Sequence, residues 1–220
     1  AVFGNVIHTE PRDMYVSRVI ALQAGLSKES AALTVNRLCG SGLQAIVSAT
    51  QLLMLGDASI TLAGGVEVMS NSAHIVQGFR WGNRMGDGNV HDMMLGALHD
   101  PFGHGHMGIT AENISDRYEI SRDNQDEFAL TSQKRASKAI NEGFFKDQIL
   151  PIEIKTRKGI NIFEVDEHPK PETTIETLSN LRTAFKKEGV VTAGNASGIN
   201  DGAAALVLAN EDKAKKGTPL

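Results

Sequence analysis

The sequence has 220 residues, of which 41% are hydrophobic and 22% charged, the proportions of an ordinary globular chain with a sizeable core. Lysine and arginine number 22 against 26 aspartates and glutamates, and the resulting net charge of −4 argues against a general nucleic-acid or anionic-membrane binder. A single cysteine excludes an internal disulfide and an all-cysteine zinc site, and it fits a reduced intracellular compartment.

The first 65 residues predict an α/β unit. Apolar, β-prone segments and helical spacing predict strands at 1–7, 32–38 and 60–65, with helices at about 11–24 and 43–55. The second helix is apolar on every face, so we expect it to be buried all round. Strands that alternate with helices in this way indicate a mostly parallel sheet.

The character of the chain changes at about Ser70. The segment Ser70–Gly105 is rich in glycine, asparagine, histidine and methionine and has weak periodicity, as functional loops often do. A long helix is predicted from the N-cap Ser121 to the stop at Gly143. Further strands are predicted at 149–155, 160–165, 190–193 and 203–209, and a helix at 174–187. The predicted organisation is an α/β core at 1–69, an inserted loop domain at 70–188, and a return to the core at 189–220.

Cys39 is the sharpest chemical feature. It lies between a predicted strand and a predicted helix in the sequence NRLCGSG, with glycines that permit close approach of a substrate to the backbone. The thiolate is the reactive form of cysteine, and a helix N-terminus favours negative charge. The pattern resembles a nucleophile elbow. A buried structural cysteine is the alternative interpretation.

Two other clusters have weaker signals. The segment Gly194–Gly202 (GNASGINDG) joins two predicted strands, and it either presents amides and a hydroxyl to a ligand or is an ordinary tight turn. His99, His104 and His106 match no standard zinc spacing, so a substrate contact or a solvated loop fits them better than a metal site. The basic stretch 155–158 is either a solvated turn or a neighbour of an anionic phosphate.

Four motifs in order resemble those of the thiolases. They are NRLCGSG at 36–42, GGVEVMS at 64–70, HMGITAEN at 106–113 and GNASGINDGA at 194–203. Further segments, including RMGD and DMMLGALHDPF, resemble the bacterial biosynthetic β-ketothiolases that make polyhydroxyalkanoate precursors. The resemblance covers essentially the whole chain. It implies an α/β thiolase-like fold, in which an N-terminal βα core carries an inserted loop domain.

The resemblance also implies a reaction, the Claisen condensation of two acyl-CoA molecules to 3-ketoacyl-CoA, or the reverse thiolysis. Cys39 would become acylated, and its own backbone N–H would be one of the donors that stabilise the oxyanion. A degradative 3-ketoacyl-CoA thiolase would keep the same fold. A noncatalytic acyl-CoA-binding or assembly fragment is the alternative from another class.

Family contacts with CoA can be carried over position by position. They fall on His106, Met107, Leu98, Phe185, Ala193, Ser197 and Lys170. His106 would line the pantetheine channel, and Ser197 would hydrogen-bond pantetheine. Lys170 stands where some members have an arginine near the adenosine phosphates, and it keeps the charge but lacks the planar fork. CoA thioesters are therefore the expected substrates, with no metal and no tightly bound cofactor.

Three family motifs are not found in this sequence. They are the GHP motif with the activating histidine, the NEAF motif with a water-holding asparagine, and the CxG motif with a second catalytic cysteine. Family members continue beyond the point corresponding to 216–220, so we expect the C-terminal core domain to be absent and the segment alone to be inactive. The resemblance further implies a cytoplasmic homo-oligomer, a dimer or tetramer, with neither nucleic-acid nor membrane partners.

Overall fold

The computed structural model describes residues 1–215 and groups them into two compact units. Unit 1 consists of residues 1–99 and the chain from Ile199 onward, and unit 2 consists of Asp100–Gly198. Residues 70–99 thus group with the first unit. The inserted loop domain expected at 70–188 stays a prediction. The chain end noted above, 216–220, lies outside the described residues.

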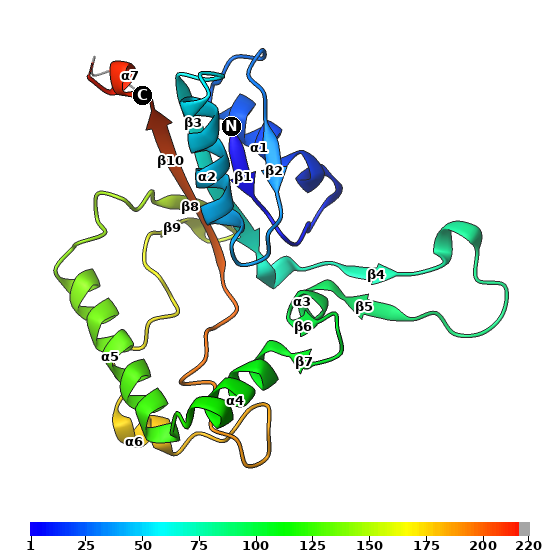
Figure 1. Cartoon of the computed structure of the whole chain (residues 1–220), viewed down its shortest axis with the longest axis vertical. Helices are drawn as coiled ribbons and strands as arrows, with labels where there is room; N and C mark the ends of the chain where they lie inside the picture. The colour runs from blue at the N-terminus through cyan, green and yellow to red at the C-terminus, as the bar shows by residue number, and fades with distance from the viewer. Residues whose placement is uncertain (216–220) are drawn as a thin grey trace. The chain divides into compact units, whose positions relative to one another are not determined.

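Unit 1 is built on a four-stranded sheet in the order β10-β3-β1-β2 (Figure 1). Its strands are β1 (Val2–Gly4), β2 (Leu33–Val35), β3 (Ile60–Val68) and β10 (Asp201–Ala209). Strand β1 pairs in parallel with both β2 and β3, whereas β10 runs antiparallel to β3 on the edge. The predicted α/β class with a mostly parallel sheet is confirmed, although β2 is shorter than its predicted range.

Helix α2 (Ser41–Met54) packs on β1 and β3, and the core lies between them (Figure 1). The core is made of small side chains, with Ala45, Ala49 and Ala63 fully buried beside Val2. Alanines let the helix approach the sheet closely. The turn η1 (Pro11–Tyr15) and helix α1 (Val16–Gln23) confirm the predicted first helix, which ends before Gly25, at a φ of +86°.

The expectation that the helix after Cys39 is buried all round is wrong for the described chain. Leu43 is 68% exposed and Met54 82% exposed on the face that points away from the sheet. The sheet can cover only one side of a helix, and within residues 1–215 the opposite apolar side has no cover. An apolar pattern reports that a face is suited to burial, and it does not say which element covers it.

The rest of unit 1 consists of short elements. They are η2 (Met69–Asn71), β4 (His74–Val76), η3 (Phe79–Trp81), β5 (Val90–Asp92), α3 (Met93–Ala97) and α7 (Glu211–Lys215). Strands β4 and β5 pair antiparallel as a hairpin. Asp92 caps α3, since its carboxylate accepts from the backbone N–H of Met94 at 2.8 Å, and this cap fixes the short helix that leads to Leu98. Strand β6 (His99–Asp100) follows at the boundary of the two units.

The elements of unit 2 are β7 (Gly105–His106), α4 (Met107–Tyr118), α5 (Arg122–Asn141), β8 (Ile152–Thr156), β9 (Gly159–Phe163) and α6 (Ile175–Ser179). The predicted long helix is confirmed, with Ser121 as its N-cap and Gly143 beyond its end at a φ of +72°. Strands β8 and β9 form the predicted hairpin. No helix within residues 1–215 is both long and apolar enough to cross a membrane.

Two predicted elements of unit 2 are corrected by the structure. The helix expected at 174–187 ends at Ser179, because the Arg122 guanidinium takes the carbonyls of Leu178, Ser179 and Leu181. The segment 190–193 is not a strand. The N–H groups of Val190 and Val191 bond a carboxylate, as described below, and Thr192 forms an isolated bridge with Thr183.

Candidate active site

Cys39 lies in the turn between β2 and α2, two residues before the helix begins. The start of α2 sits directly against the end of β1, because a Cβ added to Gly4 would come within 2.7 Å of the Ser41 backbone and side chain. Glycine at this position therefore permits the close approach. The turn lies at the carboxyl edge of the parallel strands, the edge where open α/β sheets bind their ligands.

The turn is held by hydrogen bonds from side chains to its backbone. The Ser41 hydroxyl accepts from the Arg37 N–H at 2.8 Å and donates to the Leu38 carbonyl at 2.6 Å. The Asn36 side-chain oxygen accepts from the Leu38 N–H at 3.0 Å. Leu38 has a φ of +49°, a left-handed conformation that costs a non-glycine residue roughly 1–2 kcal/mol. These bonds hold the residue before Cys39 in that conformation.

Cys39 borders a pocket of about 550 Å³ within unit 1, and its side chain is exposed. The pocket wall is mostly apolar and includes Leu38, Met69 and Leu98, so the structure places the predicted contact Leu98 on the same cavity as Cys39. The exposed position disagrees with the alternative of a buried structural cysteine. An open thiol at a helix N-terminus beside an apolar pocket suits attack on a thioester.

Two carboxylates, Glu67 and Asp201, line this pocket, and sequence reasoning missed both. Glu67, at the end of β3, accepts hydrogen bonds from the N–H groups of Val6 and Ile7. Asp201 accepts from the hydroxyl and the N–H of Ser70 at 2.6 and 2.9 Å. The hydroxyl bond, followed by the backbone bond, holds the pKa of Asp201 below its ordinary value. The only sequence signal was that each stands inside a motif.

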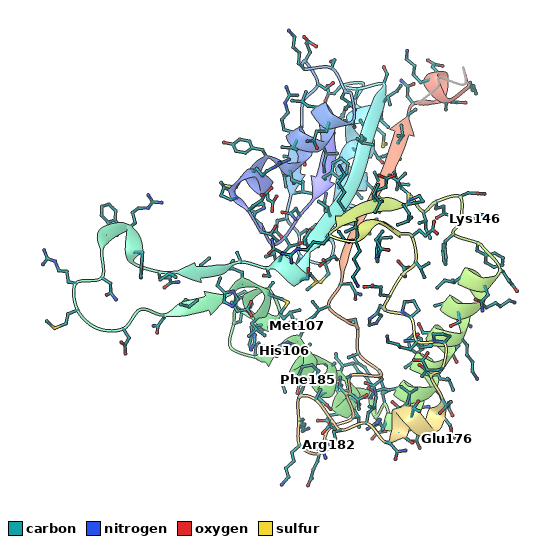
Figure 2. All side chains as sticks on the ribbon, turned by 180° about the vertical axis from the view of Figure 1, so that it is seen from behind. His106, Met107, Lys146, Glu176, Arg182 and Phe185 are labelled. Atoms are coloured by element: carbon teal, nitrogen blue, oxygen red, sulfur yellow. The ribbon has the colours of Figure 1, made fainter. Side chains whose placement is uncertain are left out.

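In unit 2 the structure brings together two of the predicted CoA contacts, His106 and Phe185. Their rings stack with centroids 4.8 Å apart and planes at 21° (Figure 2). His106 also caps α4, where its Nδ1 accepts from the N–H of Gly108 at 3.0 Å. A Cβ on Gly108 would lie 2.3 Å from the Phe185 ring, so the stack depends on glycine at this position. Met107, 41% exposed, begins the helix beside the stack (Figure 2).

Asn195, in the predicted binding loop 194–202, bonds the backbone of the segment just before it. Its amide donates to Asp126 at 2.9 Å and to the Val190 carbonyl at 3.0 Å, while its side-chain oxygen accepts from the Thr192 N–H at 2.8 Å. Asp126 is 1% exposed and in turn accepts from Arg122 at 2.7 Å. The predicted contacts Ala193 and Ser197 are both exposed on this braced segment.

Glu112 bonds the backbone of Val190 and Val191, just before the same loop. It is 1% exposed, and its carboxylate accepts from the N–H groups of Val190 and Val191 at 2.9–3.1 Å. A Cβ on Gly189 would lie 2.2 Å from this carboxylate, so the chain passes close to it. The sequence showed Glu112 only as part of HMGITAEN, because its partners are 78 and 79 residues away.

Lys170 and His99 make their own local hydrogen bonds. Lys170 is exposed, and its hydrogen bonds run to Gln133 and Glu167. His99 contacts the Leu95 carbonyl through Nδ1 at 2.7 Å. Over residues 1–215, no group of three or more histidine, cysteine, aspartate or glutamate side chains is arranged to hold a metal ion.

Residues 1–212 match the family described as the thiolase N-terminal domain. The chain belongs to the thiolase family. It is 56% identical over 216 residues to the beta-ketothiolase BktB of Cupriavidus necator, which covers 98% of this chain and 55% of that protein. The crystal structure of human mitochondrial 3-ketoacyl-CoA thiolase superposes with a TM-score of 0.93 at 43% identity, covering 98% of this chain and 55% of that one. The human enzyme in complex with CoA gives a TM-score of 0.91 at 41% identity, with 98% and 54% covered.

The thiolase membership confirms the resemblance read from the four motifs, and with it the thiolase-like α/β fold. The chain spans about 55% of the length of the curated relatives it matches. Those relatives include both beta-ketothiolases and 3-ketoacyl-CoA thiolases. The roles of Cys39 and of the seven CoA contacts stay predictions.

Proposed function

We propose that this chain carries the acyl-accepting half of a β-ketothiolase site, with Cys39 as the nucleophile. The observation that carries the proposal is an exposed thiol at the N-terminus of α2, on a mostly apolar pocket of about 550 Å³. A thioester carbonyl can reach such a thiol without displacing packed side chains.

In the proposed first step, the Cys39 thiolate attacks the carbonyl carbon of an acyl-CoA. The new carbon–sulfur bond forms as the bond to CoA breaks, and CoA leaves as its thiolate. The Cys39 N–H would donate to the oxygen that becomes negative in between. In the second step, the deprotonated α-carbon of acetyl-CoA attacks the carbonyl carbon of the acyl-cysteine. A carbon–carbon bond forms as the acyl bond to the Cys39 sulfur breaks, so 3-ketoacyl-CoA is formed and Cys39 leaves as its thiolate. The proton acceptors for that step correspond to family motifs that are not found in this sequence.

CoA thioesters are the proposed substrates, without a tightly bound cofactor. The stacked pair His106–Phe185, Met107, and the braced segment with Ala193 and Ser197 are the proposed pantetheine contacts of unit 2. Leu98 would contact the acyl end, since it shares the pocket with Cys39. Lys170 would contribute charge near the phosphates. The proposal includes a cytoplasmic homo-oligomer.

Intact mass spectrometry after a rapid acid quench tests the proposal on the protein expressed from its complete coding sequence. With excess acetyl-CoA, we expect an acetyl adduct that maps to Cys39 and is absent from Cys39→Ala, which should also lose thiolysis of acetoacetyl-CoA. If no adduct forms and Cys39→Ala keeps its thiolysis rate, the mechanism is wrong. Binding of CoA with no turnover in either direction would support the noncatalytic alternative.

The direction of the reaction is the second question, because 3-ketoacyl-CoA thiolases stand among the relatives at 44–46% identity. Rates of condensation and of thiolysis, measured with acyl-CoA substrates of increasing length, separate the two readings. A biosynthetic β-ketothiolase should condense acetyl-CoA with short acyl-CoA, whereas a degradative enzyme should favour thiolysis of longer chains.

A further inference from the structure

The hydrogen-bond pattern of the turn around Cys39 singles out one backbone amide. From Arg37 to Ser41, four N–H groups have acceptors in the turn itself: Arg37 bonds the Ser41 hydroxyl, Leu38 bonds Asn36, Gly40 bonds the Arg37 carbonyl, and Ser41 bonds the Leu38 carbonyl. In the turn as the structure describes it, where Arg37 and Cys39 form an isolated bridge, no acceptor is found for the N–H of Cys39. The turn therefore leaves one donor available, and that donor belongs to the proposed nucleophile.

Ser41 is the side chain that closes the turn. It is 4% exposed. Its hydroxyl accepts a hydrogen bond from the Arg37 N–H and donates one to the Leu38 carbonyl. The Leu38 carbonyl receives both the hydroxyl and the N–H of Ser41, at 2.6 and 2.9 Å. If the hydroxyl were removed, Leu38 would lose one bond that holds its left-handed backbone, and Arg37 would be left with an unsatisfied N–H.

Asn36 supports the same conformation from the exposed side of the turn, through its bond to the Leu38 N–H. A leucine does not adopt a φ of +49° without such support. The Leu38 carbonyl and the Cys39 N–H lie in one rigid peptide plane, so a change in the Leu38 backbone angles would reorient the Cys39 N–H. Ser41 and Asn36 therefore act on the orientation of this amide, whereas the exposure of the Cys39 sulfur does not depend on it.

We propose that Ser41 is a positioning residue of the thiolase site, assisted by Asn36. Its hydroxyl locks Leu38 in the left-handed conformation and so presents the Cys39 N–H to the oxygen of the bound thioester. The inference rests on the proposed function, because the amide matters only if an oxyanion forms at Cys39.

Two reactions of the same thiol separate this role from a merely structural one. Acylation by acetyl-CoA passes through an oxyanion, whereas alkylation by iodoacetamide displaces iodide at a saturated carbon and forms none. On the protein from the complete coding sequence, both rates at Cys39 can be followed by quenched mass spectrometry. We expect Ser41→Ala to lower acylation by roughly 10- to 100-fold while alkylation stays within about threefold of wild type.

Asn36→Ala should lower the same ratio of acylation to alkylation by a smaller factor, and its exposed position leaves the fold intact. Ser17→Ala is the matched control. Ser17 is 1% exposed and bonds the Leu33 carbonyl at 2.9 Å, away from Cys39, so its loss should leave the ratio unchanged.

The outcomes are distinct. An acylation rate of Ser41→Ala equal to that of wild type overturns the inference alone. A parallel change of both rates, shared by Ser17→Ala, shows that Ser41 is structural and also overturns it. If wild type itself forms no acetyl adduct, the proposed function fails and this inference fails with it.

Discussion

The stack of His106 on Phe185 requires a glycine at position 108, and Gly108→Ala tests this requirement. A Cβ at this position would lie 2.3–2.4 Å from three atoms of the Phe185 ring, whereas ordinary contacts begin at 3.4 Å. The ring must therefore move by about 3.4 − 2.3 = 1.1 Å, because Gly108 is buried on a helix that cannot yield as easily as one side chain. A shift of that size disrupts the stack with His106.

The expected cost follows from three terms. Overpacking costs about 1–3 kcal/mol, and loss of the stack adds about 0.5–1.5 kcal/mol. Alanine in place of glycine in a helix returns up to about 1 kcal/mol. Gly108→Ala should therefore destabilise the protein by roughly 1–4 kcal/mol, and it should weaken CoA binding if the stack lines the pantetheine site.

Urea unfolding followed by far-UV circular dichroism measures the first effect, and calorimetric titration with CoA measures the second. Gly96→Ala is the matched control, since Gly96 also lies in a helix and a Cβ there meets nothing within 4 Å. This variant should be neutral or slightly stabilised. A Gly108→Ala protein as stable as Gly96→Ala, with unchanged CoA affinity, would refute the reasoning. The double variant Gly108→Ala/Phe185→Leu should recover part of the stability.

Two further predictions concern the carboxylates that brace the loops. Ser70→Ala should raise the pKa of Asp201 toward its ordinary value, because it removes the bond from the Ser70 hydroxyl, which lowers that pKa most. Since the folded pKa is depressed, the Asp201 contribution is present above the unfolded pKa near 3.8 and is lost as the pH falls through the folded value, which carboxyl ¹³C NMR titration can follow. An unchanged pKa in Ser70→Ala would contradict this assignment. Glu112→Gln should destabilise by about 1–3 kcal/mol, because an amide offers one acceptor oxygen to the N–H groups of Val190 and Val191 and turns a donor toward them. Hydrogen exchange should speed up at those two amides, and unchanged protection there would count against the role given to Glu112.

The sequence predicted best the elements whose signals are local. Helix α5 has a serine at its N-cap and a glycine past its end, and both act within one turn of the chain. Strand β10 follows from an apolar, alanine-rich run. The turn that holds Cys39 was also visible, because glycines and small residues between a strand and a helix leave few other conformations.

The errors come from contacts that join distant parts of the chain. Helix α6 ends early because Arg122, more than 50 residues away, takes the carbonyls that a longer helix would have used. The segment 190–193 is apolar enough for a strand, but Glu112 accepts the N–H groups of Val190 and Val191. Neither partner can be found from periodicity. The same limit applies to Ser41, whose residue type suited a turn and whose bonds appear only once the backbone is placed.

The turn around Cys39 and the loop around Ser197 are stabilised in the same way. A loop that binds a ligand cannot be fixed by an apolar core, because its outer face has to stay open. Around Cys39 the buried Ser41 hydroxyl bonds the backbone, and near Ser197 the Asn195 side chain bonds the backbone of Val190 and Thr192 and is itself held by the buried Asp126. Such bonds satisfy backbone groups on the inner side and leave the outer side free. The backbone of both loops is thereby held by hydrogen bonds without being covered, and this can orient a donor or thiol before the substrate arrives.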